Sequence, residues 1–223
     1  MWCRFGVIGC GYWGPNLIRT FAQNRECQVI AVADSDWEKL KPIRLLYPTV
    51  RAATAADELL ESDKIDALAI ATPISSHYPL AKETSRRGKH VLIEKPMAAT
   101  VRQSEELIEL AAEQKRVLMV DHTFVYSGAV RKIRNLIETG ELGEIYYYDA
   151  VRINLGLFQR DLNVLWDLAP HDFSIVSYLI DKEPVSISAV GSAPVRWDGW
   201  RRESIAYITV EYADGTLAHI HVS

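Results

Sequence analysis

The sequence predicts an α/β protein in which a doubly wound parallel sheet is followed by an α+β domain with a mainly antiparallel, open sheet. Three observations support this fold class. Short apolar runs alternate with helical stretches through roughly the first 120 residues. A glycine-rich turn directly follows the first apolar run, and the alternation stops after Asp121. We therefore expect two domains, residues 1–121 and residues 122–223.

The first half contains five apolar runs with the length of buried strands, separated by stretches of helical periodicity. The runs cover residues 4–8, 29–33, 67–71, 90–93 and 117–120. Apolar positions at helical spacing occur at Leu17, Ile18 and Phe21, and further helical stretches cover residues 55–62, 80–87 and 101–114. Strands joined through helices pair in parallel, so this order predicts a parallel sheet.

In the second half, helical and strand-like stretches no longer alternate regularly. Helical patterns cover residues 129–138 and about 168–180, and strand-like runs cover 144–153, 185–190, 205–212 and 216–222. Asp214-Gly215 joins the last two runs, and Asp-Gly between alternating runs is a strong hairpin signal. The last run stops without a closing turn or helix, so we expect an incomplete second sheet.

Composition limits the classes of function. The chain has 223 residues, 48% of them hydrophobic, and a net charge of −4, so we expect a sizeable core and no nucleic-acid partner. Its three cysteines form no Cys-x-x-Cys pair and no zinc-like cluster, which favours a reduced, cytoplasmic setting and predicts no metal site. No apolar run approaches the roughly 20 residues of a membrane span, so we expect neither a signal peptide nor an anchor.

A G-x-G-x-x-G motif, Gly9-Cys10-Gly11-Tyr12-Trp13-Gly14, follows the first strand and opens the first helix. The glycines allow a tight turn and close approach of a pyrophosphate, while the helix N-terminus supplies N–H groups for the phosphates. We expect Gly9, Gly11, Tyr12, Trp13 and Gly14 to bind a dinucleotide. The alternative is an ordinary turn that happens to contain three glycines.

Asp34 ends the second strand, close to the offset of roughly 20 residues at which an acidic residue accepts hydrogen bonds from the adenosine ribose. A carboxylate there repels a 2′-phosphate, and no cationic side chain follows before Lys39. We therefore expect NAD rather than NADP, with Ser35 also in the binding site. Alternatively, Asp34 and Asp36 are solvated residues at a helix N-terminus.

Two further segments follow predicted strands. Thr72-Pro73 comes after the run at 67–71, and His77, in the next helix, could bond to a ribose or phosphate or could simply face solvent. Glu94-Lys95-Pro96 comes after the run at 90–93, where the Lys95 ammonium could hold a reacting hydroxyl and stabilise alkoxide charge. The alternative for Lys95 is a solvated surface position.

Asp167 and His171 are four residues apart, so in a helix both side chains lie on one face. Asp167 could orient His171 as a proton acceptor. Alternatively, Asp167 is a helix N-cap and His171 is a half-buried residue without a chemical role.

Together these motifs resemble the glucose-fructose oxidoreductase / inositol dehydrogenase / MocA-like family of NAD(P)-dependent oxidoreductases. The matching segments, in order, are 9–14, Thr72-Pro73 with His77, 88–96, and Asp167-x-x-x-His171, and the likeness covers essentially all 223 residues. Glu-Lys-Pro after a strand is the most specific element. The resemblance implies a Rossmann domain, Lys95 and His171 as the catalytic pair with Asp167 as the histidine's companion, and Glu94 in the cofactor site.

The resemblance also implies that the second-domain sheet lines the substrate site and joins subunits of a homo-oligomer. Relatives continue with more strands, so we expect these 223 residues alone to keep the dinucleotide site but to show weak turnover. Two features depart from the family pattern: Asn163-Val164-Leu165-Trp166 replaces a glycine-rich stretch, and Asp172 directly follows His171. The Gly-Cys-Gly-Tyr-Trp-Gly-Pro-Asn and Trp-Asp-Leu-Ala-Pro-His-Asp segments are similar to the branch associated with nucleotide-sugar and surface-polysaccharide pathways.

The expected function is therefore NAD-dependent oxidation of a sugar or nucleotide-sugar CH–OH group. Candidates for contacts with substrate hydroxyls or phosphate are Arg152, Asn154, Gln159, Arg160 and Asn163, each of which could instead be structural. Two alternatives remain: a dinucleotide-binding sensor or assembly subunit without turnover, and a simple polyol or diol dehydrogenase.

Overall fold

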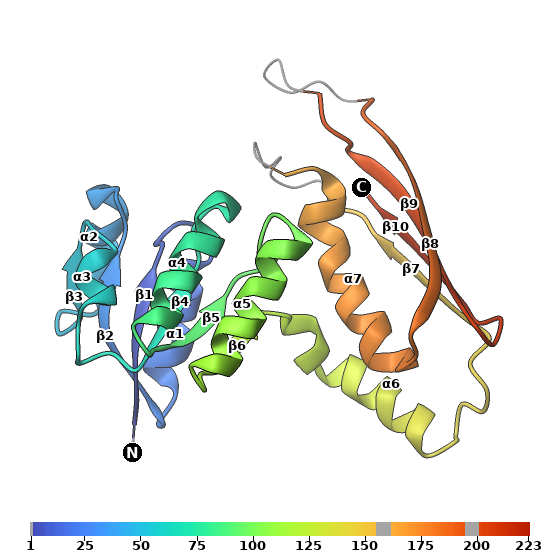
Figure 1. Cartoon of the computed structure of the whole chain (residues 1–223), viewed down its shortest axis with the longest axis horizontal. Helices are drawn as coiled ribbons and strands as arrows, with labels where there is room; N and C mark the ends of the chain where they lie inside the picture. Colours follow the sequence, from blue (N-terminus) through green and yellow to red (C-terminus); the bar gives the residue numbers. More distant parts are fainter. Residues whose placement is uncertain (1, 155–161, 195–200) are drawn as a thin grey trace. The chain divides into compact units, whose positions relative to one another are not determined.

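A computed structural model describes residues 2–154, 162–194 and 201–223. The chain divides into two compact units, Met1–Asp121 and His122–Ser223 (Figure 1). Each unit has its own sheet and its own apolar core, and each is described by itself below.

The first unit is built on a six-stranded parallel sheet. Its strands are β1 (Cys3–Ile8), β2 (Cys27–Ala33), β3 (Arg51–Ala53), β4 (Ala67–Ile70), β5 (His90–Ile93) and β6 (Leu118–Val120). Their order across the sheet is β3-β2-β1-β4-β5-β6, and every neighbouring pair is parallel. The chain order reverses between β1 and β4, which is the switch point where such sheets bind ligands.

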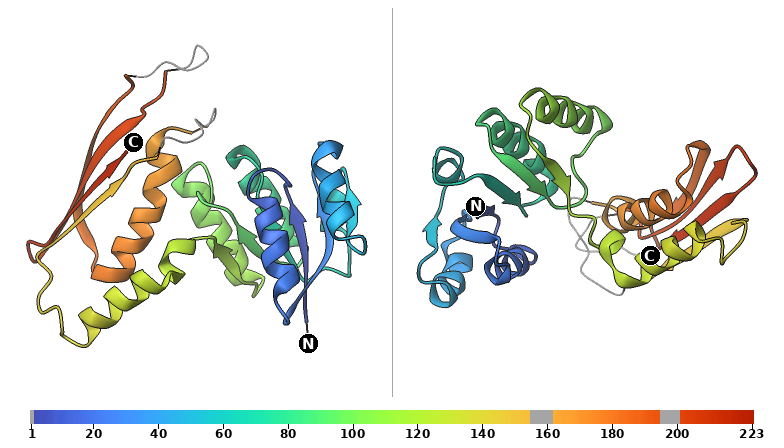
Figure 2. Two further views of the ribbon diagram at one scale, coloured as in Figure 1. Left: turned by 180° about the vertical axis from the view of Figure 1, so that it is seen from behind. Right: turned by 90° about the horizontal axis from the view of Figure 1, so that it is seen from below.

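Helices cover both faces of this sheet (Figure 2). They are α1 (Gly14–Gln23), α2 (Trp37–Leu46), α3 (Asp57–Leu60), α4 (Ile74–Arg86) and α5 (Val101–Glu113). Ile18 of α1 and Leu40 of α2 pack on one face, and α3, α4 and α5 pack on the other. Burial on both faces explains why the strands are almost continuously apolar.

The structure adds α2 and β3 to the elements that the sequence predicts. β3 is three residues long and starts with the exposed Arg51, so it produces no apolar run. α4 begins at Ile74, ahead of the helical stretch predicted at 80–87, and therefore contains Pro79 within the helix. Asp36 is the N-cap of α2, and its side chain accepts a hydrogen bond from the N–H of Glu38 at 3.0 Å.

The second unit contains a four-stranded mixed sheet and two long helices. Its elements are the 3₁₀ turn η1 (Thr123–Tyr126), α6 (Gly128–Glu138), β7 (Tyr147–Arg152), α7 (Val164–Ile180), β8 (Pro184–Ser192), β9 (Ile205–Tyr212) and β10 (Leu217–Val222). The order is β7-β10-β9-β8; β9 pairs antiparallel with β8 and β10, while β7 pairs parallel with β10. The predicted fold class, a parallel sheet followed by a mainly antiparallel one, is confirmed.

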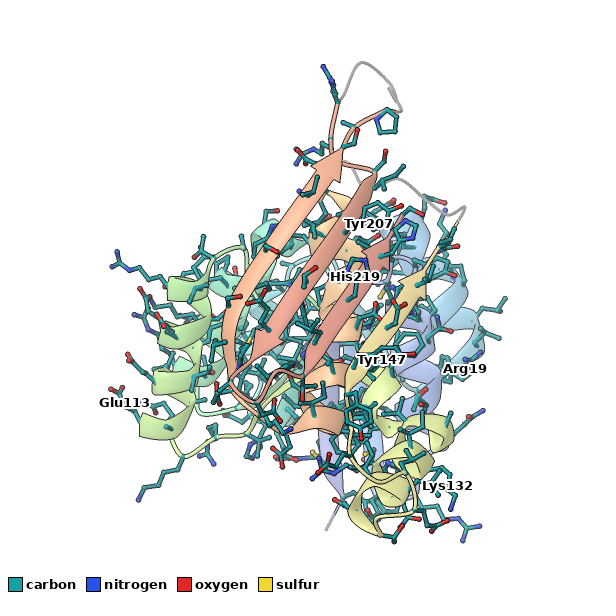
Figure 3. All side chains as sticks on the ribbon, turned by 90° about the vertical axis from the view of Figure 1, so that its right-hand side faces the viewer. Arg19, Glu113, Lys132, Tyr147, Tyr207 and His219 are labelled. Carbon is teal, nitrogen blue, oxygen red and sulfur yellow. The ribbon has the colours of Figure 1, made fainter. Side chains whose placement is uncertain are left out.

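The core of the second unit lies between α7 and one face of this sheet. Alternate residues of the central strands, such as Ile208 and Ile220, are buried against α7 residues such as Val176. The other face carries Tyr147, Tyr207 and His219 (Figure 3). Tyr147 is 72% exposed whereas Tyr148 packs against the core, as expected for tyrosines that alternate along a strand.

None of the helices within residues 2–154, 162–194 and 201–223 is both long and apolar enough to span a membrane.

Candidate functional site

The loops that follow the strands of the first sheet meet at one edge, because the carboxyl ends of parallel strands lie together. At five positions the N–H of the first loop residue donates to the carbonyl of the last residue of the neighbouring strand. These bonds are Gly9 to Ala33 (2.8 Å), Asp34 to Ala53 (3.2 Å), Ala71 to Ile8 (2.8 Å), Glu94 to Ile70 (3.0 Å) and Asp121 to Ile93 (2.9 Å). The hydrogen bonds of the sheet therefore fix where each loop begins. The predicted cofactor-binding residues of this unit lie in or next to the loops at that edge.

The three glycines of the motif differ in what surrounds them. Gly9 has φ +96°, and a Cβ there would lie 2.5 Å from the carbonyl oxygen of Ala71. A Cβ on Gly14 would lie 2.0 Å from the carbonyl oxygen of Gly9. A Cβ on Gly11 would have no protein atom within 4 Å among the described residues. The protein's own packing therefore requires Gly9 and Gly14, whereas the space beside Gly11 is open to a ligand.

The helix behind this loop starts without a side-chain cap. Trp13 occupies the N-cap position of α1 and makes no capping hydrogen bond within the part of the chain that is described. Tyr12 and Trp13 are 73% and 49% exposed, with their rings 5.1 Å apart in an edge-to-face arrangement. Uncapped N–H groups next to open space are the arrangement that binds phosphate at a helix N-terminus.

Asp34 connects the glycine-rich loop to β2. One carboxylate oxygen accepts the N–H of Cys10 at 2.7 Å, and the other accepts the N–H of Asp36 at 2.9 Å. Lys39 lies one helical turn further on, with its Nζ 3.7 Å from the Asp34 carboxylate. The carboxylate is thus fixed in place beside the loop, and each of its oxygens still has a lone pair for a ribose hydroxyl.

His77 lies in the interior of the first unit. It is 2% exposed, its Nε2 is 2.8 Å from the carbonyl oxygen of Thr72, and its Nδ1 is 2.9 Å from that of Pro96. The solvent-facing alternative is therefore wrong, because His77 is on the buried face of α4. The ring links the Thr72-Pro73 loop to the Glu94-Lys95-Pro96 loop, and a direct cofactor contact stays a prediction.

Glu94 and Lys95 extend from the end of β5, and the Lys95–Pro96 peptide bond is cis. Glu94 is buried, 8% exposed, whereas Lys95 is partly exposed. Burial, together with the nearby charge of Asp121, raises the pKa of Glu94 to about 7, although Lys95 acts in the opposite direction. The sequence pattern marked Glu94 and Lys95 but not Asp121, which only the pairing of β5 with β6 brings into the site.

Asp167 and His171 both belong to α7, one turn apart, in the second unit. The N-cap of α7 is Asn163, whose Oδ1 accepts the N–H of Trp166 at 3.1 Å, so Asp167 is not the N-cap. The His171 ring meets the Phe124 ring edge to face, with centroids 4.8 Å apart. His171 therefore belongs to α7, and its side chain packs against η1.

Arg152, a predicted substrate residue, has a partner within the protein. Its guanidinium bonds to both carboxylate oxygens of the buried Asp172, at 2.6 and 3.1 Å, and lies 4.5 Å from the centre of the Phe124 ring. Burial, followed by the charge of Asp172, raises the pKa of the neighbouring Tyr148 to about 12. Arg152, Asp172, Phe124 and His171 thus form a continuous set of contacts, of which the sequence indicated only separate members.

The other substrate candidates are Asn154 and Asn163, which the structure describes, and two residues that it does not. The side chain of Asn163 caps α7 and donates to Glu203 at 3.1 Å, and Asn154 is exposed at the end of β7. Gln159 and Arg160 lie outside the described residues. Substrate contacts by these residues stay predictions.

Two family matches cover almost the whole chain. Residues 3–122 match the family described as "Oxidoreductase family, NAD-binding Rossmann fold", and residues 130–223 match the "GFO/IDH/MocA C-terminal domain". The chain belongs to the GFO/IDH/MocA oxidoreductase family. The resemblance inferred from the sequence motifs is thereby confirmed, including the NAD-binding Rossmann domain.

Individual relatives act on sugars and other ring compounds. A UDP-N-acetylglucosamine 3-dehydrogenase of Acidithiobacillus ferrooxidans is 30% identical over 99% of this chain and 66% of its own length. A 1-carboxy-3-chloro-3,4-dihydroxycyclo hexa-1,5-diene dehydrogenase of Comamonas testosteroni is 25% identical over 99% of this chain and 57% of its own length. The chain spans about half to two thirds of the length of the curated relatives it matches.

Solved structures share the fold. The WlbA dehydrogenase from Bordetella pertussis, in complex with NADH and UDP-GlcNAcA, aligns with a TM-score of 0.90 at 22% identity, covering 100% of this chain and 67% of that one. At this identity the similarity establishes the fold alone. The glycine-rich loop, the open space at Gly11 and the fixed Asp34 carboxylate fit the phosphates and ribose of NAD.

We expect Gly11→Ala to affect cofactor binding and Gly14→Ala to affect the stability of the protein. Gly11→Ala should leave the melting temperature nearly unchanged but weaken NADH binding at least tenfold, because the added methyl group enters the ligand's space. Gly14→Ala should destabilise the cofactor-free protein, because its Cβ would overlap the Gly9 carbonyl. Thermal denaturation and NADH fluorescence titration measure the two effects. Unchanged NADH affinity in Gly11→Ala would refute this assignment of the phosphate site.

Proposed function

We propose that this protein is an NAD-dependent dehydrogenase that oxidises, or in reverse forms, a CH–OH group of a sugar or nucleotide sugar. The observation that supports it best is the composition of one sheet edge, where an open glycine-rich loop and a fixed Asp34 carboxylate lie at the same edge as Glu94-Lys95. The substrate class follows from relatives such as the UDP-N-acetylglucosamine 3-dehydrogenase. Three thiols without a disulfide fit a reduced, cytoplasmic setting.

Different residues of the chain have different roles at the substrate hydroxyl group. NAD, when bound, supplies the hydride acceptor. The Lys95 ammonium holds the hydroxyl oxygen and stabilises the negative charge that develops there. His171 accepts the hydroxyl proton, and Asp167, one turn before it on α7, orients the imidazole. The Phe124 ring packs against His171 and restricts its ring, and the Arg152 guanidinium, paired with Asp172, lies over Phe124 in turn.

A sensor or assembly subunit without turnover is the alternative from another class of function, and a polyol or diol dehydrogenase is the alternative substrate assignment. The presence of both Lys95 and His171 favours an enzyme. Absorbance at the reduced-nicotinamide band, after mixing the protein with NAD and a panel of sugars, nucleotide sugars and polyols, distinguishes the three.

Asp34 is expected to select NAD over NADP, because its carboxylate would accept hydrogen bonds from the ribose hydroxyls and repel a 2′-phosphate. Asp34→Ala should lose most of this preference, and Lys39 would then be free to attract the phosphate. Calorimetric titration of the wild type, Asp34→Ala and Asp34→Ala/Lys39→Ala with both cofactors tests this. Equal affinities in the wild type would contradict it.

Lys95→Ala and His171→Ala should each lower turnover by about 10² to 10⁴, the usual effect of losing a positioned proton-transfer group. NADH affinity and melting temperature should stay near the wild-type values in His171→Ala. Lys132→Ala, on the exposed surface of α6, is the matched control and should behave as wild type. Near-normal turnover of both active-site variants on the true substrate would show that the catalytic assignment is wrong.

The outer face of the second sheet is proposed as the contact between subunits of a homo-oligomer. Large side chains of four strands are exposed on this face, among them Tyr147, Val151, Val190, Tyr207 and Leu217 (Figure 3). Contiguous exposed apolar patches mark interaction sites.

Val190→Glu and Tyr207→Glu should therefore convert an oligomer to monomers, since each places a charge within the patch. Leu45→Glu, at an exposed apolar position on α2, should leave the assembly state unchanged. Sedimentation velocity over a range of protein concentrations measures the assembly state. A wild type that stays monomeric at the highest concentration would contradict this contact.

A further inference from the structure

Two carboxyl groups lie side by side at the ends of neighbouring strands. β5 and β6 are neighbouring parallel strands (Figure 1). Leu92 is opposite Met119, and Ile93 is opposite Val120. The next residues on the two strands are Glu94 and Asp121, and the ladder continues to this level because Asp121 N–H donates to the Ile93 carbonyl at 2.9 Å. Side chains in register on adjacent strands share one face, so the two carboxyl groups meet.

The side chains of Glu94 and Asp121 are hydrogen-bonded to each other. A carboxylate can only accept a hydrogen bond, so a bond between two carboxyl groups needs a proton on one of them. Glu94 is also buried, and burying two adjacent negative charges is costly. Geometry and burial therefore both favour one proton held by the pair.

The pair also contacts the residue that the proposed function places at the reacting hydroxyl. The backbone N–H of Lys95 donates to the Glu94 carboxyl group, and the Lys95 charge acts on that group as well. We propose that Glu94 and Asp121 form a carboxylic acid–carboxylate pair that holds one proton, positions Lys95, and matches its positive charge with a single negative charge. This role in positioning rests on the proposed function, whereas the shared proton does not.

The shared proton makes a specific prediction for the pH dependence of stability. The pKa of Glu94 is raised to about 7, whereas an unfolded glutamate titrates near 4.3. A raised pKa in the folded state means that the stabilising contribution is complete below about pH 4.3 and is lost as the pH rises through about 7. The charged groups that act on Glu94 are Asp121, from the end of β6, and Lys95.

The test compares Glu94→Gln and Asp121→Asn with wild type in the absence of cofactor. The amide group introduced in each variant can donate the hydrogen bond that the shared proton provides in the wild type. The introduced glutamine and asparagine side chains do not titrate. We expect the melting temperature of the wild type to fall relative to Glu94→Gln between pH 5.5 and 8.5. Asp121→Asn should show a weaker pH dependence of the same sign, because Glu94 stays buried but no longer faces a second carboxyl group. Glu105→Gln, which removes an exposed carboxyl group from α5, should parallel the wild type.

Infrared spectroscopy of wild type and both variants gives a second readout that does not depend on turnover. The carbonyl band of a protonated carboxylic acid should be present in the wild type at pH 6 and lost as the pH rises to 8.5. The band should be absent from Glu94→Gln, and in Asp121→Asn it should be lost at a lower pH than in the wild type. If the band is absent from the wild type, or if the melting temperature of Glu94→Gln parallels that of the wild type at every pH, the shared proton is refuted.

Turnover on the true substrate separates this inference from the proposed function. The pH profile of kcat/KM should bend near pH 7 in the wild type and in Glu105→Gln. This bend should be lost in Glu94→Gln and move to lower pH in Asp121→Asn. A shared proton in a protein that oxidises no CH–OH substrate would refute the proposed function and leave the pair standing. A bend that persists in both variants would refute the positioning role.

Discussion

The close approach of backbone at the turn between β1 and α1 is the constraint on which the first unit depends. The α1 helix starts so near the end of β1 that Gly14 has no room for a Cβ against the Gly9 carbonyl. Gly9 in turn lies against Ala71, so the loops after β1 and β4 are in contact. Because Asp34 accepts the N–H of Cys10, the loop after β2 is fixed to the same turn. Three loops from three neighbouring strands are thereby held at one edge.

In the second unit, the corresponding constraint is an ion pair rather than a backbone contact. Asp172 is buried on α7, next to His171, and its charge is matched by Arg152 at the end of β7. Removing one partner of such a pair leaves an uncompensated charge and is strongly destabilising, whereas the intact pair fixes the relation between helix and strand. The Phe124 ring lies against both Arg152 and His171, so the position of the imidazole depends on the packing of β7, η1 and α7 together.

The sequence predicted the parts of the fold and site that leave a local pattern. The five predicted strands of the first unit, the glycine-rich turn and the Asp214-Gly215 hairpin all have short-range signals, and the structure contains each of them. The burial of His77 also had a signal, since Ile74, His77 and Ala81 follow helical spacing and all three are buried. Arg152 with Asp172, and Glu94 with Asp121, join residues 20 and more positions apart, and only the tertiary fold determines such pairs.

Asp34 and Glu94 occupy corresponding positions at the same edge of the sheet, each directly after a parallel strand. The groups that surround the two carboxyl groups are nevertheless different. Each Asp34 oxygen accepts one backbone N–H, and Lys39 lies nearby, so this carboxylate is surrounded by hydrogen-bond donors and a positive charge. Glu94 faces a second carboxyl group in a buried position, an arrangement that favours the protonated form. A carboxylate fixed by two backbone N–H groups suits the recognition of ribose hydroxyls. A carboxyl group that titrates near neutral pH suits a position beside Lys95, because the charge next to the lysine can then change under the conditions in which the proposed reaction moves a proton.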